Sequence, residues 1–184
     1  MDHHTIRAAA GTDWPAISEV LLAAFGETEG RPIVDLVAAL LADPTARPLW
    51  SLVATSDDRV VGYILFTTAR IEPARGNPAA AILAPMAVHP ACQQRGIGRR
   101  LIHEGLERLR VDGVGLVFVL GDPVFYTRFG FAPAGEQGLT APYPVPTEHA
   151  DAWMVQALPP AAGGQASGRV VCADPLMDPT HWLE

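Results

Sequence analysis

Two hydrophobic periods divide this chain into helices and strands. Apolar residues recur every three or four positions over 17–25 and again over 33–41, which predicts two amphipathic helices. The polar segment Gly26–Arg31 separates them, and the Asp43–Pro44 step ends the second helix. A third helical pattern covers residues 99–111. Two of the predicted helices therefore come before the longest strands.

Shorter runs rich in β-branched and aromatic residues predict the strands. Such runs cover residues 5–8, 49–55, 60–70, 79–88, 114–120, 153–158 and 168–173, and a further strand begins at Phe131. Pro85 lies inside one of these runs. Because proline donates no ladder hydrogen bond, this strand must lie at an edge, contain a bulge, or splay away from a neighbour. The order of helices and strands is that of a mixed α/β (α+β) domain.

Length and composition favour a single folded domain with a short appendage. The chain has 184 residues, 49% of them hydrophobic and 18% charged, a balance typical of globular proteins. We expect the domain to cover residues 3–158, followed at 159–184 by a Pro/Gly-rich linker and a C-terminal tail with a short strand. No apolar run approaches the roughly 20 residues of a membrane span, and residues 1–10 lack a signal-peptide core. These features predict a cytoplasmic protein without a membrane partner.

The charged residues of the chain limit the classes of molecule that it is expected to bind. A formal net charge of −7 argues against nucleic acid, whose binding needs a basic surface. All 13 basic residues are arginine, which rules out a Walker-type P-loop, a Schiff-base lysine and a lysine general base. Cys92 and Cys172 stand far apart and fit no metal-binding spacing, so we expect free thiols and no metal site.

The central segment has the pattern of an anion site. An apolar run ending at Val88 leads into a short loop with Gly96 and Gly98, and a helix follows. Free backbone N–H groups and the positive end of the helix dipole point at whatever occupies such a turn. In one interpretation this is a dinucleotide fingerprint with Asp122 on the ribose. Against it, Leu101 stands at the third glycine position, and too little chain follows for a second nucleotide-binding half.

In the other interpretation, the hexapeptide QQRGIG (Gln93–Gly98) forms a turn whose successive N–H groups face one concavity. Glycine would be used there because a Cβ would obstruct a pyrophosphate approaching the backbone. Arg95, Arg99 or Arg100 could add charge-assisted contacts. Taken alone, a hexapeptide of this kind is a weak signal.

Three stretches in the right order strengthen the second interpretation. They are L-x-P-M-A-V-H-P (Leu83–Pro90), QQRGIG (Gln93–Gly98) and FYTRFGF (Phe125–Phe131), and together they resemble the GCN5-related N-acetyltransferase (GNAT) superfamily. The resemblance implies a central mixed, mostly antiparallel sheet flanked by helices. In it, the parallel strands at 79–88 and 114–120 splay apart. It also implies acetyl-CoA as co-substrate and no metal.

The resemblance assigns roles to particular residues. The backbone groups of three strand residues would bond the pantetheine amides: Met86, Ala87 and Val88. The backbone N–H groups of five turn residues would hold the pyrophosphate: Arg95, Gly96, Ile97, Gly98 and Arg99. Tyr126 matches the tyrosine that often protonates the departing thiolate; alternatively, its ring only packs against the cofactor.

The sequence leaves several candidates for the general base that accepts the amine proton. Family members often place a glutamate on the central strand, but residues 81–88 contain no acid. The candidates are Glu27, Glu29, Glu72, His89 and Asp122, or a chain of water molecules. The Gly-Asp-Pro segment at 121–123 also departs from the asparagine-containing version common in the superfamily, so a cofactor contact of that asparagine is not expected here.

The resemblance implies an N-acetyltransferase that moves an acetyl group from acetyl-CoA to a primary amine of a small molecule, peptide or protein, by direct transfer in a ternary complex. Gly26–Arg31 and Thr140–Ala150 are the expected acceptor walls. The alternative is an acyl-CoA-binding sensor or interaction module without turnover, which the missing strand glutamate favours. A hydroxyl acceptor or a longer acyl chain also stays open, and a homodimer formed through the late strands is compatible with the pattern.

Overall fold

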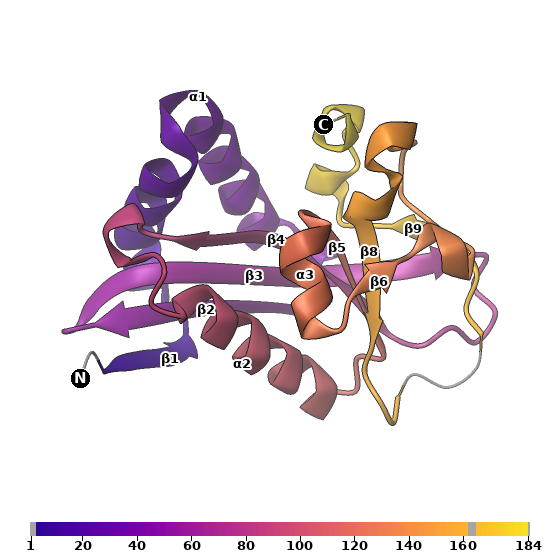
Figure 1. The fold of residues 1–184 in the computed structure, drawn as a ribbon, viewed down its shortest axis with the longest axis horizontal. Helices are drawn as coiled ribbons and strands as arrows, with labels where there is room; N and C mark the ends of the chain where they lie inside the picture. Colours follow the sequence, from indigo (N-terminus) through magenta and orange to yellow (C-terminus); the bar gives the residue numbers. More distant parts are fainter. Residues whose placement is uncertain (1–2, 162–164, 184) are drawn as a thin grey trace.

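The computed structural model describes residues 3–161 and 165–183, and these are built around one sheet (Figure 1). Its main strand order is β1-β2-β3-β4-β5-β8-β6, with β9 pairing β3 and β7 pairing β9. The strands are β1 (His4–Ala8), β2 (Leu49–Ser56), β3 (Arg59–Glu72), β4 (Ala80–Val88), β5 (Leu116–Leu120), β6 (Ala132–Pro133), β7 (Leu139–Thr140), β8 (Trp153–Ala157) and β9 (Gly168–Val171). Among the described pairs, only β4–β5 and β7–β9 are parallel. The expected mixed, mostly antiparallel sheet is confirmed.

Helices cover both faces of this sheet. The helices are α1 (Trp14–Ala42), α2 (Ile97–Val111) and the short α3 (Pro123–Tyr126). In Figure 1, α1 lies above the strands and α2 lies below them. Successive side chains of a strand point to opposite faces of the sheet, so odd- and even-numbered residues of β3 belong to different cores. Tyr63 and Leu65 belong to the core under α1, whereas Ile64 and Phe66 belong to the core against α2.

The two predicted N-terminal helices are joined more tightly than expected. Gly26 is the non-helical residue inside α1, with φ 81° and ψ 176°, a conformation that favours glycine. The chain then folds back, so that a Cβ on Gly30 would lie only 3.0 Å from the Cα of Leu22. The prediction of a break over all of Gly26–Arg31 was therefore too long, because a single glycine accomplishes the turn.

Pro85 lies where β4 leaves its regular pairing. The β3–β4 register shifts between Ile64 and Phe66, so that β4 bulges between Leu83 and Met86. The parallel ladder with β5 ends at the Leu83–Val119 pair, although β4 continues to Val88. The strand is thus both bulged and splayed, two of the three arrangements that the proline allowed.

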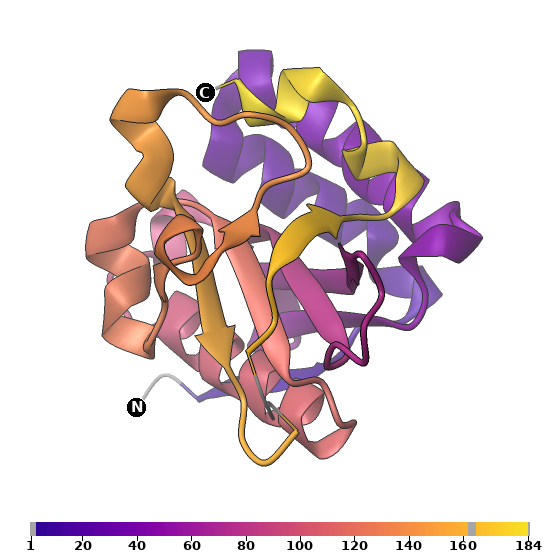
Figure 2. The same cartoon turned by 90° about the vertical axis from the view of Figure 1, so that its right-hand side faces the viewer.

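The C-terminal residues are part of the core. β9 is the predicted late strand, and it pairs with β3 at Arg70–Glu72. Figure 2 shows the segment that follows β9 running beside α1, on the same side of the sheet. Its two 3₁₀ turns, Asp174–Leu176 and Pro179–Trp182, carry buried side chains into the core under α1. The domain boundary expected after residue 158 stays a prediction, and residues 162–164 of the predicted linker lie outside the described residues.

Other differences from the sequence patterns are small. The strand expected from Phe131 is only the two-residue β6, and β7 carries no pattern that a sequence could reveal, because two residues define no period. Both cysteines are free thiols, as predicted. Within residues 3–161 and 165–183, no helix combines the length and hydropathy needed to cross a bilayer.

Trp182 provides a test of the C-terminal segment. Its side chain is 2% exposed, its indole Nε1 donates to the carbonyl of Leu176 over 2.9 Å, and its ring meets Trp153 edge-on. We expect Trp182→Ala to lower the free energy of unfolding by about 3–5 kcal/mol, because it leaves a cavity in the core. Leu183→Ala is the control, since Leu183 is 63% exposed. Equal urea midpoints for the two variants would contradict this role of the segment.

Candidate functional site

A cleft of about 630 Å³ opens where β4 ends and α2 begins. Residues of β4, of the turn after it, of α2, of the bend in α1 and of the α3 segment form its walls; they are 24–25, 86–88, 92–94, 96–99, 125 and 128. We call this the β4 cleft. It brings together most of the predicted cofactor-binding residues: Met86, Ala87, Val88, Gly96, Ile97, Gly98 and Arg99.

One edge of β4 faces the cleft, and within the described residues no neighbouring strand pairs with its backbone groups there. The N–H of His89 donates to the carbonyl of Val61 over 2.8 Å. Because main-chain groups alternate along an antiparallel strand, Ala87 points its N–H and C=O toward β3, and Met86 and Val88 point theirs the opposite way. No strand covers that side, since the β4–β5 ladder has already ended. The Gln93 side-chain amide, which donates to the Val88 carbonyl over 3.1 Å, reaches this edge.

The turn after β4 has the backbone shape of an anion site. Gln94 and Gly96 both adopt positive φ, 61° and 76°. Ile97, Gly98 and Arg99 then form the first turn of α2, where N–H groups have no acceptor within the helix. A left-handed residue next to a helix start directs successive N–H groups toward one point. The backbone of this turn is therefore the part of the cleft best suited to bind a phosphate group.

The charges that line the cleft are positive. They come from Arg99 and Arg128, both exposed, and no carboxylate or histidine is among the lining residues. Arg95, the remaining predicted pyrophosphate ligand, lies in the same turn. In a chain of net charge −7, this local excess of arginine is suited to a polyphosphate. Among the residues that the structure describes, no cluster of three or more His, Cys, Asp or Glu could hold a metal ion.

Tyr126 lies beside the end of β5 rather than among the lining residues. Its ring packs directly on Gly121, where an added Cβ would come within 2.4 Å of the ring carbon Cε2. The rings of Phe125 and Phe131 meet it edge-on at 5.0 and 5.7 Å. Burial raises the pKa of the Tyr126 phenol to about 12. Its hydroxyl is therefore protonated at neutral pH, and no described residue hydrogen-bonds to it.

The five candidate bases occupy very different places. Glu72 ends β3 beyond its pairing with the first residues of β4, so it lies at the far end of the sheet from Val88. His89 and Asp122 already act as caps. The Nδ1 of His89 accepts the Ala91 N–H over 3.2 Å, and a carboxylate oxygen of Asp122 accepts the Val124 N–H over 2.9 Å.

The two remaining carboxylates are close in sequence to a lining residue of the cleft but do not line it. Glu27 and Glu29 follow Phe25, which lines the cleft, and both side chains are exposed at the bend of α1. The other predicted acceptor wall, Thr140–Ala150, lines a different cavity of about 510 Å³ together with Arg169. That cavity shares no lining residue with the β4 cleft. From α1, only Ala24 and Phe25 line the β4 cleft, so the residues of the predicted wall Gly26–Arg31 follow the lining residues in the chain and are not among them.

Five lining residues belong neither to the predicted site residues nor to the predicted Gln93–Gly98 turn: Ala24, Phe25, Cys92, Phe125 and Arg128. Phe25 and Phe125 provide apolar walls, and Arg128 adds charge. Phe25 looks in the sequence like one more residue of an amphipathic stripe, so only its position beside Gly26 could have distinguished it. Phe125 and Arg128 belong to the FYTRFGF stretch, which drew attention to Tyr126 instead.

Comparison with known proteins adds independent observations. The acetyltransferase (GNAT) domain family matches residues 49–133, from the start of β2 to β6. The uncharacterized N-acetyltransferase YjhQ of Escherichia coli K12 is 45% identical over 174 residues, which cover 94% of each chain. The uncharacterized N-acetyltransferase YhbS of the same strain is 37% identical over 95 residues, which cover 50% of this chain and 55% of YhbS.

Solved structures resemble the whole chain. The GNAT family N-acetyltransferase YhbS of Escherichia coli, in complex with CoA, superposes with a TM-score of 0.83 at 30% identity and covers 96% of this chain and 93% of its own. A GNAT family acetyltransferase from Brucella melitensis, in complex with acetyl-CoA, gives a TM-score of 0.73 at 30% identity, covering 96% and 99%. The similarity therefore includes the C-terminal segment as well as the central motifs.

Gly121 offers a test of how Tyr126 is held. We expect Gly121→Ala to lower the free energy of unfolding by about 1–3 kcal/mol, because the new methyl group must displace a buried ring. Gly135→Ala is the matched control, since an added Cβ there meets no atom within 4 Å. Denaturant unfolding of both variants measures the difference. If the two variants are equally stable, Tyr126 does not rest on Gly121.

Proposed function

The chain belongs to the GNAT family of N-acetyltransferases, and from this premise we propose that it transfers an acetyl group from acetyl-CoA to a primary amine of a small molecule, peptide or protein. We propose direct transfer, with donor and acceptor bound together. The observation that carries the proposal is the open edge of β4 beside a turn of converging N–H groups. An extended amide-containing arm and a pyrophosphate are the chemical groups that such a pair of features binds.

The donor would lie along β4. The N–H and C=O of Met86 and the N–H of Val88 face the open side and can bond the pantetheine amides as an extra strand would, whereas the Val88 carbonyl already accepts from the Gln93 amide. Ala87 directs its backbone toward β3 and takes part only as a wall of the cleft. The N–H groups at the start of α2, together with the side chains of Arg99 and Arg128, would hold the pyrophosphate. The two similar structures are complexes with CoA and acetyl-CoA, which supports a donor of this class.

The reaction requires two proton movements. The attacking nitrogen must lose a proton as it bonds to the acetyl carbon, and the departing thiolate is stabilised if a donor is near. We assign the donor role to the Tyr126 hydroxyl, because a phenol carries its proton at neutral pH and this one has no hydrogen-bond partner among the described residues; burial raises its pKa further, to about 12. For the amine proton we propose water, which passes it to the exposed carboxylates of Glu27 and Glu29 at the bend of α1.

The acceptor would enter past the bend of α1. Phe25 gives this entrance an apolar surface, and the two following glutamates are unpaired acids among the described residues. An apolar contact next to carboxylates suits a substrate that arrives as an ammonium ion. This arrangement favours an amine over a neutral hydroxyl acceptor.

Acetyl-CoA binding tests the first part of the proposal. Titration calorimetry on the full chain should show one site with a dissociation constant in the micromolar range, with free CoA competing for it. The control ligand is pantetheine without the nucleotide, which should bind more weakly because it lacks the pyrophosphate. Absence of binding at about 1 mM acetyl-CoA would refute the proposed function.

Tyr126→Phe tests the proton donor. Removing the hydroxyl while keeping the ring should lower kcat by about 10- to 100-fold and leave the dissociation constant of acetyl-CoA unchanged, since the role concerns only the departing thiolate. CoA release in the presence of an amine panel, followed with a thiol reagent, measures the turnover. Unchanged turnover would show that the ring only packs against its neighbours.

A further inference from the structure

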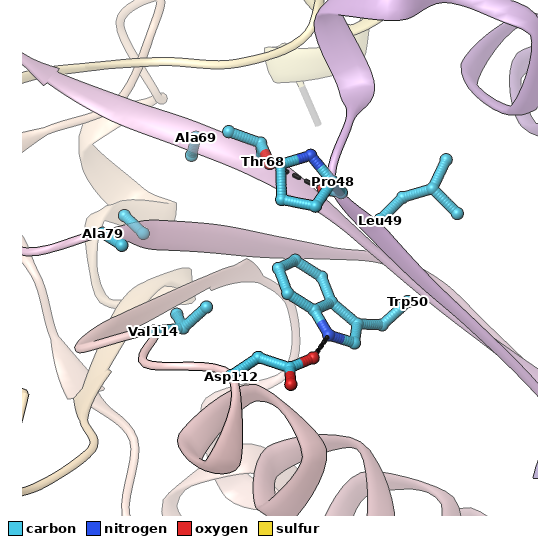
Figure 3. Close-up of a pocket in the computed structure, with 9 residues that line it drawn as sticks. Pro48, Leu49, Trp50, Thr68, Ala69, Ala79, Asp112 and Val114 are labelled. Carbon is cyan, nitrogen blue, oxygen red and sulfur yellow. Dashed lines mark hydrogen bonds between the residues drawn. The ribbon is translucent and has the colours of Figure 1, made fainter.

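A second cavity lies at the opposite end of β4 from the β4 cleft (Figure 3). Its volume is about 590 Å³, and it opens between the start of β2 and the end of α2. Ala80, the first residue of β4, lines it, whereas Met86 and Val88 line the β4 cleft. Ala80 and Met86 are six residues apart along β4, which corresponds to a distance of about 20 Å between the two spaces. We call this second space the Trp50 cavity.

The walls of the Trp50 cavity are mostly apolar, and two of its polar groups already have partners within the protein. Figure 3 shows the Trp50 indole standing between β2 and the end of α2, with Pro48 and Val114 around the same space. The Thr68 hydroxyl donates to the carbonyl of Pro48 over 2.6 Å. The carbonyl of Ala79 accepts two backbone N–H groups from the start of β5. The Thr68 proton and the Ala79 carbonyl are therefore already engaged.

Asp112 is the exception. One of its carboxylate oxygens accepts the Trp50 indole N–H over 2.7 Å, and the other has no hydrogen bond within the described residues. Asp112 caps the C-terminus of α2, where the helix dipole is negative. The arginines of the preceding turns do not neutralise it, because Arg108 pairs with Glu104 at 3.0 Å and Arg110 with Glu107 at 2.6 Å.

We propose that the Trp50 cavity binds a small organic ammonium ion with a flat apolar body. The charged head would donate to the free oxygen of Asp112, and the body would fill the space beside the indole, whose face also attracts a cation. A volume of about 590 Å³ with one open polar group is typical of a small-molecule site. The inference does not rest on the proposed reaction, since no residue that lines this cavity lines the β4 cleft.

The test uses phenethylammonium as the probe and 2-phenylethanol as its uncharged counterpart. Calorimetric titration of the full chain should show the ammonium ion binding at least about tenfold more tightly than the alcohol. Asp112→Asn should remove this preference, because the amide oxygen can still accept the indole N–H while the charge is lost. Asp35→Asn is the matched control, an exposed aspartate on α1 away from this cavity. Saturation with CoA should leave the affinity for the ammonium ion unchanged.

Three results would overturn the proposal. One is the absence of phenethylammonium binding at about 10 mM. Another is equal affinity for the alcohol and the ammonium ion, or an Asp112→Asn variant that retains the preference. The third is displacement of the probe by CoA, which would place the amine in the β4 cleft. Failure of acetyl-CoA to bind would refute the proposed function and leave this test standing.

Discussion

The loss of pairing between β4 and β5 is the constraint on which the site depends. Unpaired backbone groups inside a folded protein are costly unless a partner satisfies them. Here the ladder stops at Leu83 and Val119, and Pro85 and the bulge carry β4 away from its neighbour. The β3 side of the strand remains paired, so β4 stays rigid while its other edge is left for an extended ligand. A site made of backbone depends little on side-chain identity, and the cleft accordingly needs few polar side chains.

The two helical layers hold this open edge in place from opposite faces. α2 packs against β2 and β3 through residues such as Leu101, and its first turn is thereby fixed beside the end of β4. α1 covers the other face, and its bend at Gly26 brings Phe25 over the same cleft. The C-terminal segment extends the α1 side of the core and ends in the buried Trp182. Both helical layers therefore contribute walls to the cleft.

Side chains of opposite charge lie near the two ends of β4, although the net charge of the chain is −7. The end next to the start of α2 is lined by arginine, and the end next to the C-terminus of α2 carries the open carboxylate of Asp112. The dipole of α2 has the same polarity, positive at its first turn and negative at its last. One helix thus contributes opposite partial charges at the two ends of the sheet, in agreement with the anion proposed for the β4 cleft and the cation proposed for the Trp50 cavity.

Most of the helices and longer strands, the Gln93–Gly98 turn and the anomaly at Pro85 could be predicted from the sequence, because they depend on neighbouring residues and on backbone chemistry. The sequence could not show which candidate base, Glu72 or Glu27, lies nearer the cleft, since these positions follow from strand register and from the bend of α1. The packing of Tyr126 on Gly121, the pairing of Trp50 with Asp112 and the burial of Trp182 were likewise decided only in the tertiary structure. Each is a contact set by the packing of elements rather than by a repeating pattern, and such contacts leave no period in the sequence.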